Sequence, residues 1–478
     1  MNRTLPGAAL IALIWSTAVA DDAVVGHETL FQSPNGITER CVQIAPMPGA
    51  TYSEADLATE ALYCGIDLYA PTIGLCPKTW STSPAMVIHD LSSGPFVGDR
   101  AGFEATACAE GKHAKRSSGG EIVRIKPSMN DPRTSGTFSQ SPLLYYHLSR
   151  FLGSDVGVST AVWRSMDRAM HREAIAQPGV EIAQVRGSGP MMQAAWEIFV
   201  AAHANPDSYV PTDDVFVADR SAIYGTMLRN RGDDYGPEIN GTSDADWGIE
   251  VYSAFQQTAP YLALRSDLPL AEAVAESVAV AIADPQIAEA MGTDPNPRQI
   301  VFWMADMANV AVLDFVLNQQ DRFGNIDYVD RWYWSEDGQL MSANKNAFDL
   351  ASGNLPQGAM LLQRTHINDN DAGVRPEYHN FARESGMLEN LRHFPAGTYR
   401  QLMALDADLK VQGPLHAYLG TSFGLSEAAF GNLVANVALA ADTLRAQCLA
   451  GTMQFDLDPA AFILSGAVAP GVIDCANP

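Results

Sequence analysis

The most informative part of this chain is Leu313-Asp314-Phe315-Val316-Leu317-Asn318-Gln319-Gln320-Asp321-Arg322-Phe323-Gly324-Asn325. It closes a helical pattern over residues 298–320 that carries apolar residues on more than one face, which predicts a buried helix. Asp321 and Arg322 follow at its C-terminal end, and Phe323-Gly324-Asn325 predicts a tight turn. Such a helix can deliver polar side chains into a cleft; a surface Asp-Arg ion pair is the competing interpretation.

A second carboxylate, Asp349, stands 28 residues beyond Asp321 in Ala347-Phe348-Asp349-Leu350-Ala351-Ser352-Gly353. Residues 328–334 between them predict a strand, and Asp337-Gly338 predicts a hairpin turn. A hairpin can bring both carboxylates to one site. Phosphoryl transfer uses one Asp to orient the attacking hydroxyl and a later Asp, with a nearby Asn, to hold metal. The spacing therefore favours phosphoryl transfer, with a simple turn-forming role for Asp349 as the alternative.

A lysine ends a strand-like segment further upstream. Gly119-Gly120 lies between two strand candidates and predicts a hairpin, and Glu121-Ile122-Val123-Arg124-Ile125-Lys126 predicts the strand that follows. A lysine at the end of a strand under a glycine-rich turn can meet nucleotide phosphates as a compact charge. An ordinary surface lysine is the alternative.

The rest of the chain predicts an α+β protein with two lobes. Ser141 as N-cap, Pro142 at the first helical position and Gly153 as a stop predict a helix, and residues 156–163 a strand. Further helices are predicted over 191–204, 268–283, 298–319, 398–410 and 426–449. We expect a cysteine-containing extension over 21–100 lying on the main body, a small sheet-rich lobe over 101–190 and a larger helical lobe over 191–478.

The N-terminus predicts export. Arg3, an apolar run and Ala18-Val19-Ala20 are typical of a signal peptide over 1–20, whereas the run is too short for the alternative of a membrane anchor. We expect a secreted or periplasmic protein with no membrane span after cleavage. All six cysteines lie beyond this segment, which indicates disulfides. Fifteen pairings are possible; the preferred one joins Cys448 to Cys475 and keeps the other four within the first 110 residues.

The charge of the chain narrows its partners. With 55 acidic and 30 basic residues the net charge is −25, which disfavours nucleic acid and anionic membranes. A nucleotide would need a local basic group and a divalent metal. Two acidic runs, residues 233–246 and Asn368-Asp369-Asn370-Asp371, lack the spacing of a calcium loop and are interpreted as solvated loops. No Gly-x-Ser-x-Gly motif supports a hydrolase.

In order along the chain, these segments resemble the Golgi casein kinase and four-jointed family of secretory-pathway kinases. The resemblance covers about residues 119–410, with a divergent stretch over 165–295. It rests on the glycine turn and Lys-Pro strand through Ile125-Lys126-Pro127, Asn130-Asp131-Pro132-Arg133, Tyr146-His147-Leu148-Ser149-Arg150-Phe151-Leu152-Gly153, Val156-Gly157-Val158, Leu313-Asp314-Phe315-Val316-Leu317 with Asp321-Arg322, Leu391-Arg392-His393-Phe394 and Thr398-Tyr399-Arg400-Gln401-Leu402.

The resemblance implies a divergent, bacterial-type member with an atypical protein-kinase-like fold. It implies ATP with Mn²⁺ or Mg²⁺ as cofactors and a protein Ser/Thr or sugar hydroxyl as acceptor. The implied roles place Asp321 as catalytic base and Lys126 on the phosphates. Gly119, Gly120 and Arg322 belong to the nucleotide site, and Asp349, Asn325 and Gln140 to the metal.

Two positions depart from the family pattern. The helix after the lysine strand usually begins with a Glu, whereas no Glu occurs between Lys126 and His171 and Gln140 occupies that neighbourhood. The His that usually follows Asp-Arg is Phe323. A pseudokinase or nucleotide-binding scaffold without phosphotransfer is therefore the first alternative. An unrelated exported protein with a helical body, such as a carbohydrate or peptide hydrolase, is the second.

Overall fold

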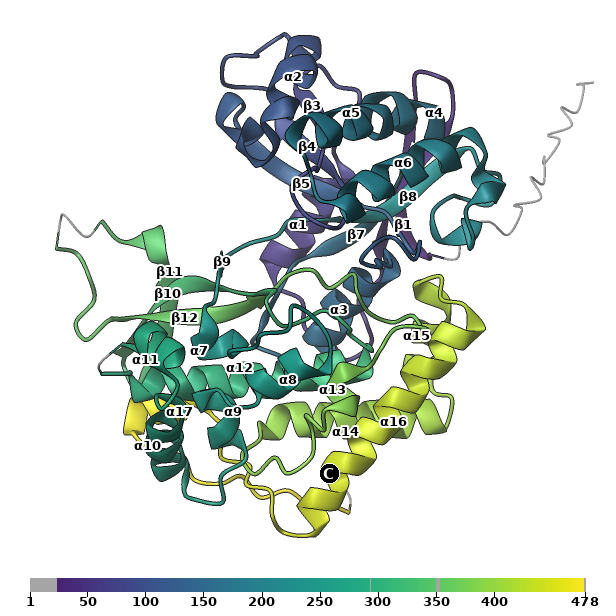
Figure 1. The fold of residues 1–478 in the computed structure, drawn as a ribbon. Helices are drawn as coiled ribbons and strands as arrows, with labels where there is room; N and C mark the ends of the chain where they lie inside the picture. Colours follow the sequence, from purple (N-terminus) through teal and green to yellow (C-terminus); the bar gives the residue numbers. More distant parts are fainter. Residues whose placement is uncertain (1–23, 293, 350–352, 477–478) are drawn as a thin grey trace, which may run out of the picture.

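The computed structural model describes residues 24–292, 294–349 and 353–476, so the predicted signal peptide over 1–20 lies outside the described residues. Two lobes stand one above the other in Figure 1. The upper lobe is built around a sheet, and the lower lobe is mainly helical. The predicted α+β class with a sheet-rich N-terminal lobe and a larger helical lobe is confirmed.

A seven-stranded antiparallel sheet forms the N-terminal lobe. Its order is β1 (Gly26–Gln32), β2 (Thr38–Ile44), β7 (Ala161–Asp167), β8 (Ala222–Leu228), β5 (Gly120–Lys126), β4 (Met86–Asp90) and β3 (Ile73–Pro77). The stretch expected as a separate extension thus supplies both edges of the sheet. The reason is packing: Val42 and Leu75 are fully buried in the lobe. Strand β8 also lies beyond residue 190, where the helical lobe was expected to begin.

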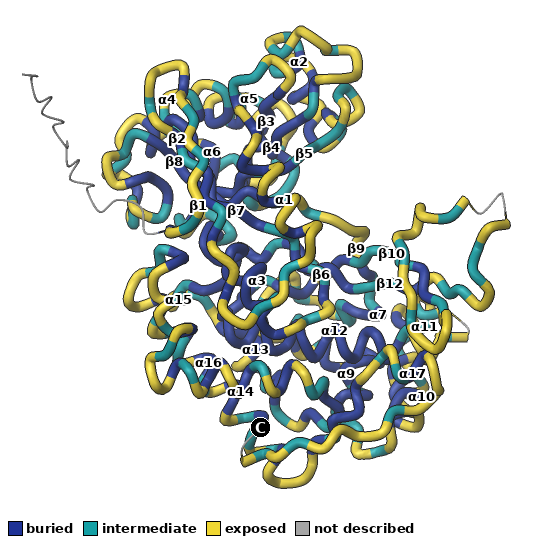
Figure 2. The backbone as a smooth tube through the Cα atoms, turned by 180° about the vertical axis from the view of Figure 1, so that it is seen from behind, coloured by how far each residue is buried: buried dark blue, intermediate teal, exposed yellow. Residues whose placement is uncertain are grey.

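The sheet has an apolar layer on each face. Helices α5 (Gln177–Arg186) and α6 (Pro190–Ala204) cover one face, where Trp196 and Phe199 pack with Val123 and Ile125 of β5. The alternating residues on the other face, such as Trp163, join the main core together with helix α3 (Gln140–Phe151). Figure 2 shows the backbone of α3 and its neighbours as buried, so α3 lies where the two lobes meet.

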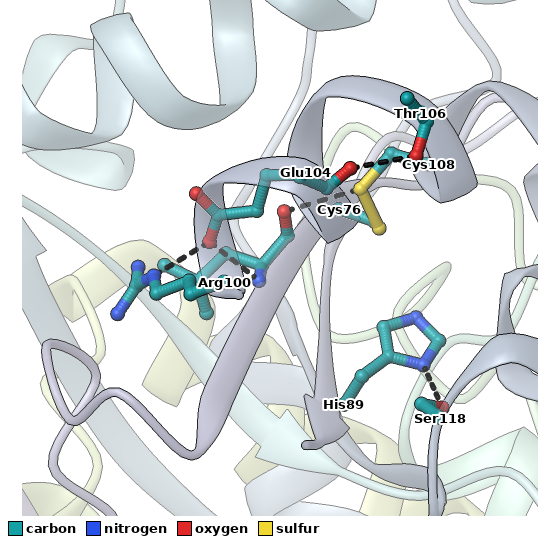
Figure 3. The surroundings of a disulfide bond; sticks show 9 residues. Cys76, His89, Arg100, Glu104, Thr106, Cys108 and Ser118 are labelled. Carbon is teal, nitrogen blue, oxygen red and sulfur yellow. Dashed lines mark hydrogen bonds and ion pairs between the residues drawn. A yellow bond between two sulfur atoms is a disulfide. The ribbon is translucent and has the colours of Figure 1, made fainter. Parts of the chain in front are cut away.

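Three disulfides, Cys41–Cys64, Cys76–Cys108 and Cys448–Cys475, confirm the preferred pairing. The first two tie helix α1 (Glu54–Cys64) and the segment after helix α2 (Arg100–Thr106) to the sheet. Figure 3 shows the second, beside which Glu104 pairs with Arg100 at 2.8 Å and accepts a hydrogen bond from the Leu75 amide. The disulfide and these polar contacts hold α2 against β3.

The hairpin predicted at Gly119-Gly120 is absent from the structure. The residues before the glycines form a 3-10 helix (Ala107–Ser117), so no strand precedes β5 there. Gly120 has φ of +126°, which lets the chain turn directly into the strand. The turn that does join two neighbouring strands of this region is residues 78–85, between β3 and β4.

The stretch 313–325 forms the last turn of helix α12 (Pro297–Val316) and the loop that follows it, and every residue of the helix from Ile300 to Val316 is buried. The helix is long and apolar enough to span a membrane by composition, but 94% of its apolar window is buried inside the protein, as expected of a core helix. Around it lie α7 (Pro237–Asn240), α8 (Ile249–Phe255), α9 (Ala259–Leu264), α10 (Leu270–Ala281), α11 (Pro285–Met291), α13 (Phe381–Glu384), α14 (Ala396–Lys410), α15 (Pro414–Ser422), α16 (Glu427–Leu449) and α17 (Pro459–Ser465). The five later helices predicted from periodicity are confirmed as α6, α10, α12, α14 and α16.

A smaller sheet joins the helical lobe to the sheet lobe. Its order is β11 (Gln339–Asn344), β10 (Ile326–Glu336), β12 (Met360–Ile367) and β6 (Gly157–Val158), with β9 (Asp233–Asp234) also on β10. The predicted hairpin turn at Asp337-Gly338 is confirmed, with positive φ at both residues. Strand β10 pairs with β12 as well, and Ile326 lies opposite Ile367. The segment before β10 and the segment after β12 therefore lie at the same end of this sheet.

Candidate active site

Lys126 is the last residue of strand β5, an inner strand of the sheet, and lies at the end of the strand that faces the helical lobe. The register pairs Pro77 with Met86 and Met86 with Ile125, so the β3–β4 turn over 78–85 lies at the Lys126 end of the sheet. Gly120 pairs with Asp90 at the other end. Lys126 is six positions along the strand from Gly120, about 20 Å at about 3.3 Å per residue. The turn beside Lys126 is thus the β3–β4 turn and not Gly119-Gly120.

Lys126 is bound by two carboxylates of the helical lobe. Its Nζ lies 2.5 Å from Asp369 Oδ1 and 3.1 Å from Asp371 Oδ2, and the lysine side chain is 1% exposed. These aspartates follow β12, in the run interpreted from the sequence as a solvated loop. That interpretation is wrong for this run, because Asn368, Asn370 and Asp371 are buried.

The ionisation of this cluster follows from burial and proximity. Burial by itself would raise the pKa of the Asp369 carboxyl, but Lys126 and Lys78 hold it below its usual range. Burial would lower the pKa of Lys126, yet attraction to Asp369 and Asp371 raises it. The lysine and Asp369 are therefore both charged, and together they form an ionic link between the lobes.

Asp321 lies in the loop after α12, beside the same cluster. The Asp321 amide donates to Gln319 Oε1 at 3.0 Å, and the Gln320 amide donates to the Ala372 carbonyl at 3.0 Å. Burial, reinforced by the charges of Asp369 and Asp371 and opposed by Arg322, raises the pKa of Asp321 to about 6. A carboxylate in this state is still mostly ionised at neutral pH and is more basic than an exposed one.

Arg322 is buried and has a supporting position. Its guanidinium pairs with Asp314 of α12 at 3.0 Å, and neither side chain is exposed. It also donates to the Asn368 carbonyl and to Asn370 Oδ1, both at 2.7 Å. Because these bonds occupy the guanidinium, Arg322 holds the 368–371 loop in place and does not reach the cleft where a nucleotide would contact it.

Lys78 is a second lysine of the cluster, and the sequence patterns did not reveal it. It opens the β3–β4 turn, is 3% exposed and donates to Ser83 Oγ at 3.2 Å. Burial first, and then repulsion by Lys126, lowers the pKa of Lys78 to about 7. Nothing in the local sequence Cys76-Pro77-Lys78-Thr79 marks this lysine, since only the strand register brings it to Lys126.

An open cleft of about 430 Å³ runs beside the cluster, lined by Gly120 and Arg124 of β5, the connection 229–232, and Asn325, Asp327 and Asp369 below. Asn325 donates through its side chain to the Asp321 carbonyl at 3.2 Å, which places the predicted amide beside the predicted base. Asp327 lies next to Asp234 of β9; burial and a hydrogen bond between the two carboxyls raise its pKa. The cleft is therefore acidic along the helical lobe. On its other walls Arg124 of β5 pairs with Glu121 at 2.7 Å, and the further basic lining residues are Lys115, Arg229 and Arg231.

Two predicted residues have other partners. Gly119 lies against Asp90 and Ser93, and its amide donates to the Asp90 carbonyl at 2.7 Å. Gln140 opens α3, is buried and donates to the Tyr224 hydroxyl at 3.1 Å on the sheet. Its neighbour Ser141, predicted as the N-cap, lies inside the helix and donates instead to the Asn370 carbonyl at 2.5 Å. The start of α3 therefore supports the 368–371 loop, but Gln140 itself does not contact Lys126.

Asp349 lies away from the cluster. It is exposed on the connection between β11 and β12, and the adjacent Phe348 packs edge-on against Trp334. Trp334 is seven residues along β10 from Asp327, about 23 Å at strand spacing. The expected convergence of Lys126, Asp321 and Asp349 on one cleft is therefore absent. Along the sequence, strand β12 lies between Asp349 and the two carboxylates that pair with Lys126, Asp369 and Asp371.

The described residues include no group of three or more His, Cys, Asp or Glu side chains arranged to hold a metal ion. Two carboxylates, Asp369 and Asp371, are nevertheless placed to bind a metal ion together with substrate phosphates. Asp371 is buried with both oxygens near Lys126 Nζ, Oδ1 at 3.2 Å and Oδ2 at 3.1 Å, and the Asp369 side chain is 36% exposed and lines the cleft. Mg²⁺ commonly binds through one or two carboxylates and completes its shell with water and substrate phosphates. These two aspartates fit that mode and fit no all-protein metal cage.

Comparison with known proteins gives a distant structural likeness. No family model and no curated protein sequence matches the chain. The chain is similar to a crystal structure of the Golgi casein kinase, with 12% identity, 85% of this chain and 80% of that chain covered, and a TM-score of 0.43. For the Golgi casein kinase with Mn/ADP bound, the identity is 11%, the coverage 83% and 77%, and the TM-score 0.41. These values do not place the chain in a family.

Proposed function

We propose that this protein is an exported atypical kinase that transfers the γ-phosphoryl group of ATP to a hydroxyl of a protein Ser/Thr or a sugar. The observation that carries the proposal is the meeting of Lys126 from the sheet lobe with Asp369 and Asp371 from the helical lobe, beside Asp321. Four groups of the types that phosphoryl transfer requires come from three distant segments to one cluster between the lobes, beside a cleft that Asp369 lines. The three disulfides support an oxidising compartment.

Each residue has a role that its environment supports. Lys126 and Lys78 bring positive charge to the phosphates, while the cleft beside β5, at about 430 Å³, is within the size range of a small-molecule site. Asp369 and Asp371 would hold Mg²⁺ or Mn²⁺, which neutralises phosphate charge when bound. Asp321 orients the acceptor hydroxyl and takes its proton, which its raised pKa favours. Catalysis then rests on alignment and charge stabilisation.

One observation favours a second candidate, a nucleotide-binding protein without phosphotransfer. The helix after β5, α3, offers Lys126 no carboxylate because it contains no acidic residue, and Gln140 at its start is bonded to Tyr224. Lys126 is instead held directly by Asp369 and Asp371, so metal and lysine share the same carboxylates. If the carboxylates that Lys126 also occupies hold the metal weakly, the protein is expected to bind the nucleotide without transferring its phosphoryl group.

Transfer of label from [γ-³²P]ATP with Mn²⁺ to Ser/Thr peptides and sugars tests the proposal, using Asp321→Asn, Asp371→Asn and Asp349→Asn. Loss of the base is expected to lower the rate by roughly 10²–10⁴-fold. Asp371→Asn is expected to abolish metal-dependent transfer, and Asp349→Asn to keep the wild-type rate. A thermal shift with ATP and Mn²⁺ measures binding separately. Binding without transfer in the wild type would establish the second candidate, and loss of transfer in Asp349→Asn alone would reject our assignment.

A further inference from the structure

A second polar cavity, of about 640 Å³, lies between the lobes on the far side of the 229–232 connection from Lys126. Its walls come from helix α1, the end of α3 with the segment before β7, and strands β10, β11 and β12. Five arginines line it: Arg150, Arg229, Arg231, Arg331 and Arg364. In a chain with a net charge of −25, this concentration of guanidinium groups on one concave surface is opposite to the overall charge.

Two of these arginines are neutralised within the protein. Arg150 pairs with Asp56 at 2.8 Å, and Arg364 pairs with Asp306 at 2.9 Å. Asp56 also accepts a hydrogen bond from Thr160, so both of its oxygens are engaged. These two arginines form a rigid floor and leave little charge for a ligand.

The other three arginines have no ion pair within the described chain. Arg229 and Arg231 are exposed on the connection between the lobes. Arg331 of β10 contacts only uncharged groups, Asn344 Oδ1 and Ser342 Oγ, both at 3.1 Å. The one other acid that lines the cavity, Asp155, is exposed, and its carbonyl accepts a hydrogen bond from Arg364 at 3.1 Å. Among the described residues, no carboxylate therefore forms an ion pair with these three arginines, and their guanidinium groups are available to an anionic ligand.

The rest of the wall is rich in hydroxyls. The serines and threonines that line the cavity include Thr51, Ser53, Thr59, Ser159, Thr160 and Ser342. Hydroxyls together with guanidinium groups suit a ligand that carries both an anionic group and hydroxyls, since arginine binds phosphate and sulfate through paired N–H donors. The volume suits a small molecule. The pKa of His366, which also lines the cavity, is lowered to about 4 by burial first and then by the positive charges of Arg231 and Arg150.

We propose that this cavity binds a small sugar bearing a phosphate or sulfate group, with Arg331 from the helical lobe and Arg229 and Arg231 from the connection contacting the anion. The site is independent of the proposed phosphotransfer, because Arg331 does not line the cleft beside Lys126. Arg229 and Arg231 line both spaces, so an occupied cavity would hold the connection that also borders the nucleotide cleft.

Isothermal titration of the full chain with glucose 6-phosphate, glucose 6-sulfate, inorganic phosphate and glucose tests the site. Saturable binding of the esters and none of glucose is expected. Arg331→Gln should weaken that binding at least about tenfold, since a bidentate charged contact is lost. Arg331→Lys should restore part of it by keeping the charge. Arg400→Gln is the matched control, because Arg400 is exposed on α14 outside the cavity and has the same charge.

The outcomes separate the possibilities. Equal affinity for inorganic phosphate and the sugar esters would support the anion site and reject a sugar contact. Equal weakening by Arg331→Gln and Arg400→Gln would overturn the proposal, as would glucose binding as tightly as its esters. Circular dichroism of Arg331→Gln shows whether the variant is folded. If it is not, Arg231→Gln on the exposed connection replaces it in the same comparison.

Discussion

Asp321 shows how far the surroundings of a single residue set its chemistry. It is partly buried, two carboxylates of the 368–371 loop lie near it, and Arg322, the adjacent cation, is bound to Asp314. Burial and like charge both favour its neutral form, so its pKa is raised to about 6. An aspartate outside such a cluster would be a much weaker base.

The pH dependence of activity follows from this environment. Only the ionised carboxylate can accept the hydroxyl proton, so kcat/KM is expected to rise with pH up to about 6 and to level off above it. A pH–rate profile with ATP and Mn²⁺ measures this. A profile with its acidic limb near pH 4 would show that Asp321 is not the titrating base.

The same shift predicts a stability change in the metal-free protein. The folded-state pKa of Asp321 lies above the ordinary value of 3.8, so the folded protein binds the extra proton and stability falls as pH rises from about 4 to 6. Asp321→Asn removes that loss. We expect the variant to be more stable than wild type at pH 7 by about 1–2 kcal/mol, after allowing for solvent screening, and equally stable at pH 4. Urea unfolding at the two pH values measures the difference.

Lys78 carries a prediction of its own. Its amino group is buried beside Lys126 and, within the part of the chain that the structure describes, donates to the Ser83 hydroxyl alone, so it suits an incoming phosphate. Lys78→Met preserves the aliphatic stem and is expected to weaken ATP binding about tenfold, or about 1.4 kcal/mol. Lys112→Met, at an exposed lysine outside the cleft, is expected to leave the affinity unchanged. Equal affinities in a nucleotide titration would remove Lys78 from the site.

At the scale of elements, the pairing of β10 with β12 creates the site. Ile326 opposite Ile367 brings the loop after α12 and the loop after β12 to one end of the small sheet. Backbone hydrogen bonds then join the loops, including the one from the Gln320 amide to the Ala372 carbonyl at 3.0 Å. Helix α12 adds the buried Asp314–Arg322 pair, which anchors the 368–371 loop from below.

Asp314→Asn tests the importance of that anchor. The substitution leaves the fully buried Arg322 without its counter-ion, so a loss of about 3–5 kcal/mol in the free energy of unfolding is expected. Asp330→Asn, which breaks the pair with the 58% exposed Lys345, is expected to cost less than about 1 kcal/mol. Chemical denaturation compares the two. Similar small losses would mean that Arg322 finds other partners.

Helices were more predictable than the connections between strands. The apolar periodicity of α12 and the Asp337-Gly338 turn are local, and both predictions are confirmed. The sequence analysis chose Asp349, which precedes strand β12, whereas the carboxylates that pair with Lys126 follow β12. Residues 345–349 and 353–359 belong to the connection before β12, and no local signal shows that the chain returns to pair with β10. Asn368-Asp369-Asn370-Asp371 looked like a solvated loop because its burial depends on residues hundreds of positions away.

At the scale of the whole molecule, the two lobes are joined by charge as well as by apolar packing. The Lys126–Asp369 and Lys126–Asp371 pairs cross between them, and α3 packs on both. The surrounding surface is strongly acidic, with a net charge of −25, so its charges repel one another in the compact state. Buried pairs are screened weakly by salt, whereas surface repulsion is screened strongly.

Salt is therefore expected to stabilise this protein. Raising NaCl from 0.01 to 0.15 M shortens the Debye length from about 30 to 8 Å, and we expect Tm to increase by about 1–3 °C. Differential scanning calorimetry across this range measures the change. A fall in Tm would show that attractive surface pairs outweigh the net repulsion.

Patterns along the chain predicted the buried helix before Asp321, the later helices and the Cys448–Cys475 pair, whereas the pairing of the other four cysteines stayed open until the structure. Only the tertiary structure decided which carboxylates meet Lys126, that Lys78 joins them, and that residues 26–90 form the edges of the main sheet. Helical periodicity and turn residues act over a few positions, so they can be read along the chain. Strand register and buried ion pairs join residues far apart in sequence, and their energies arise only when the lobes close around them.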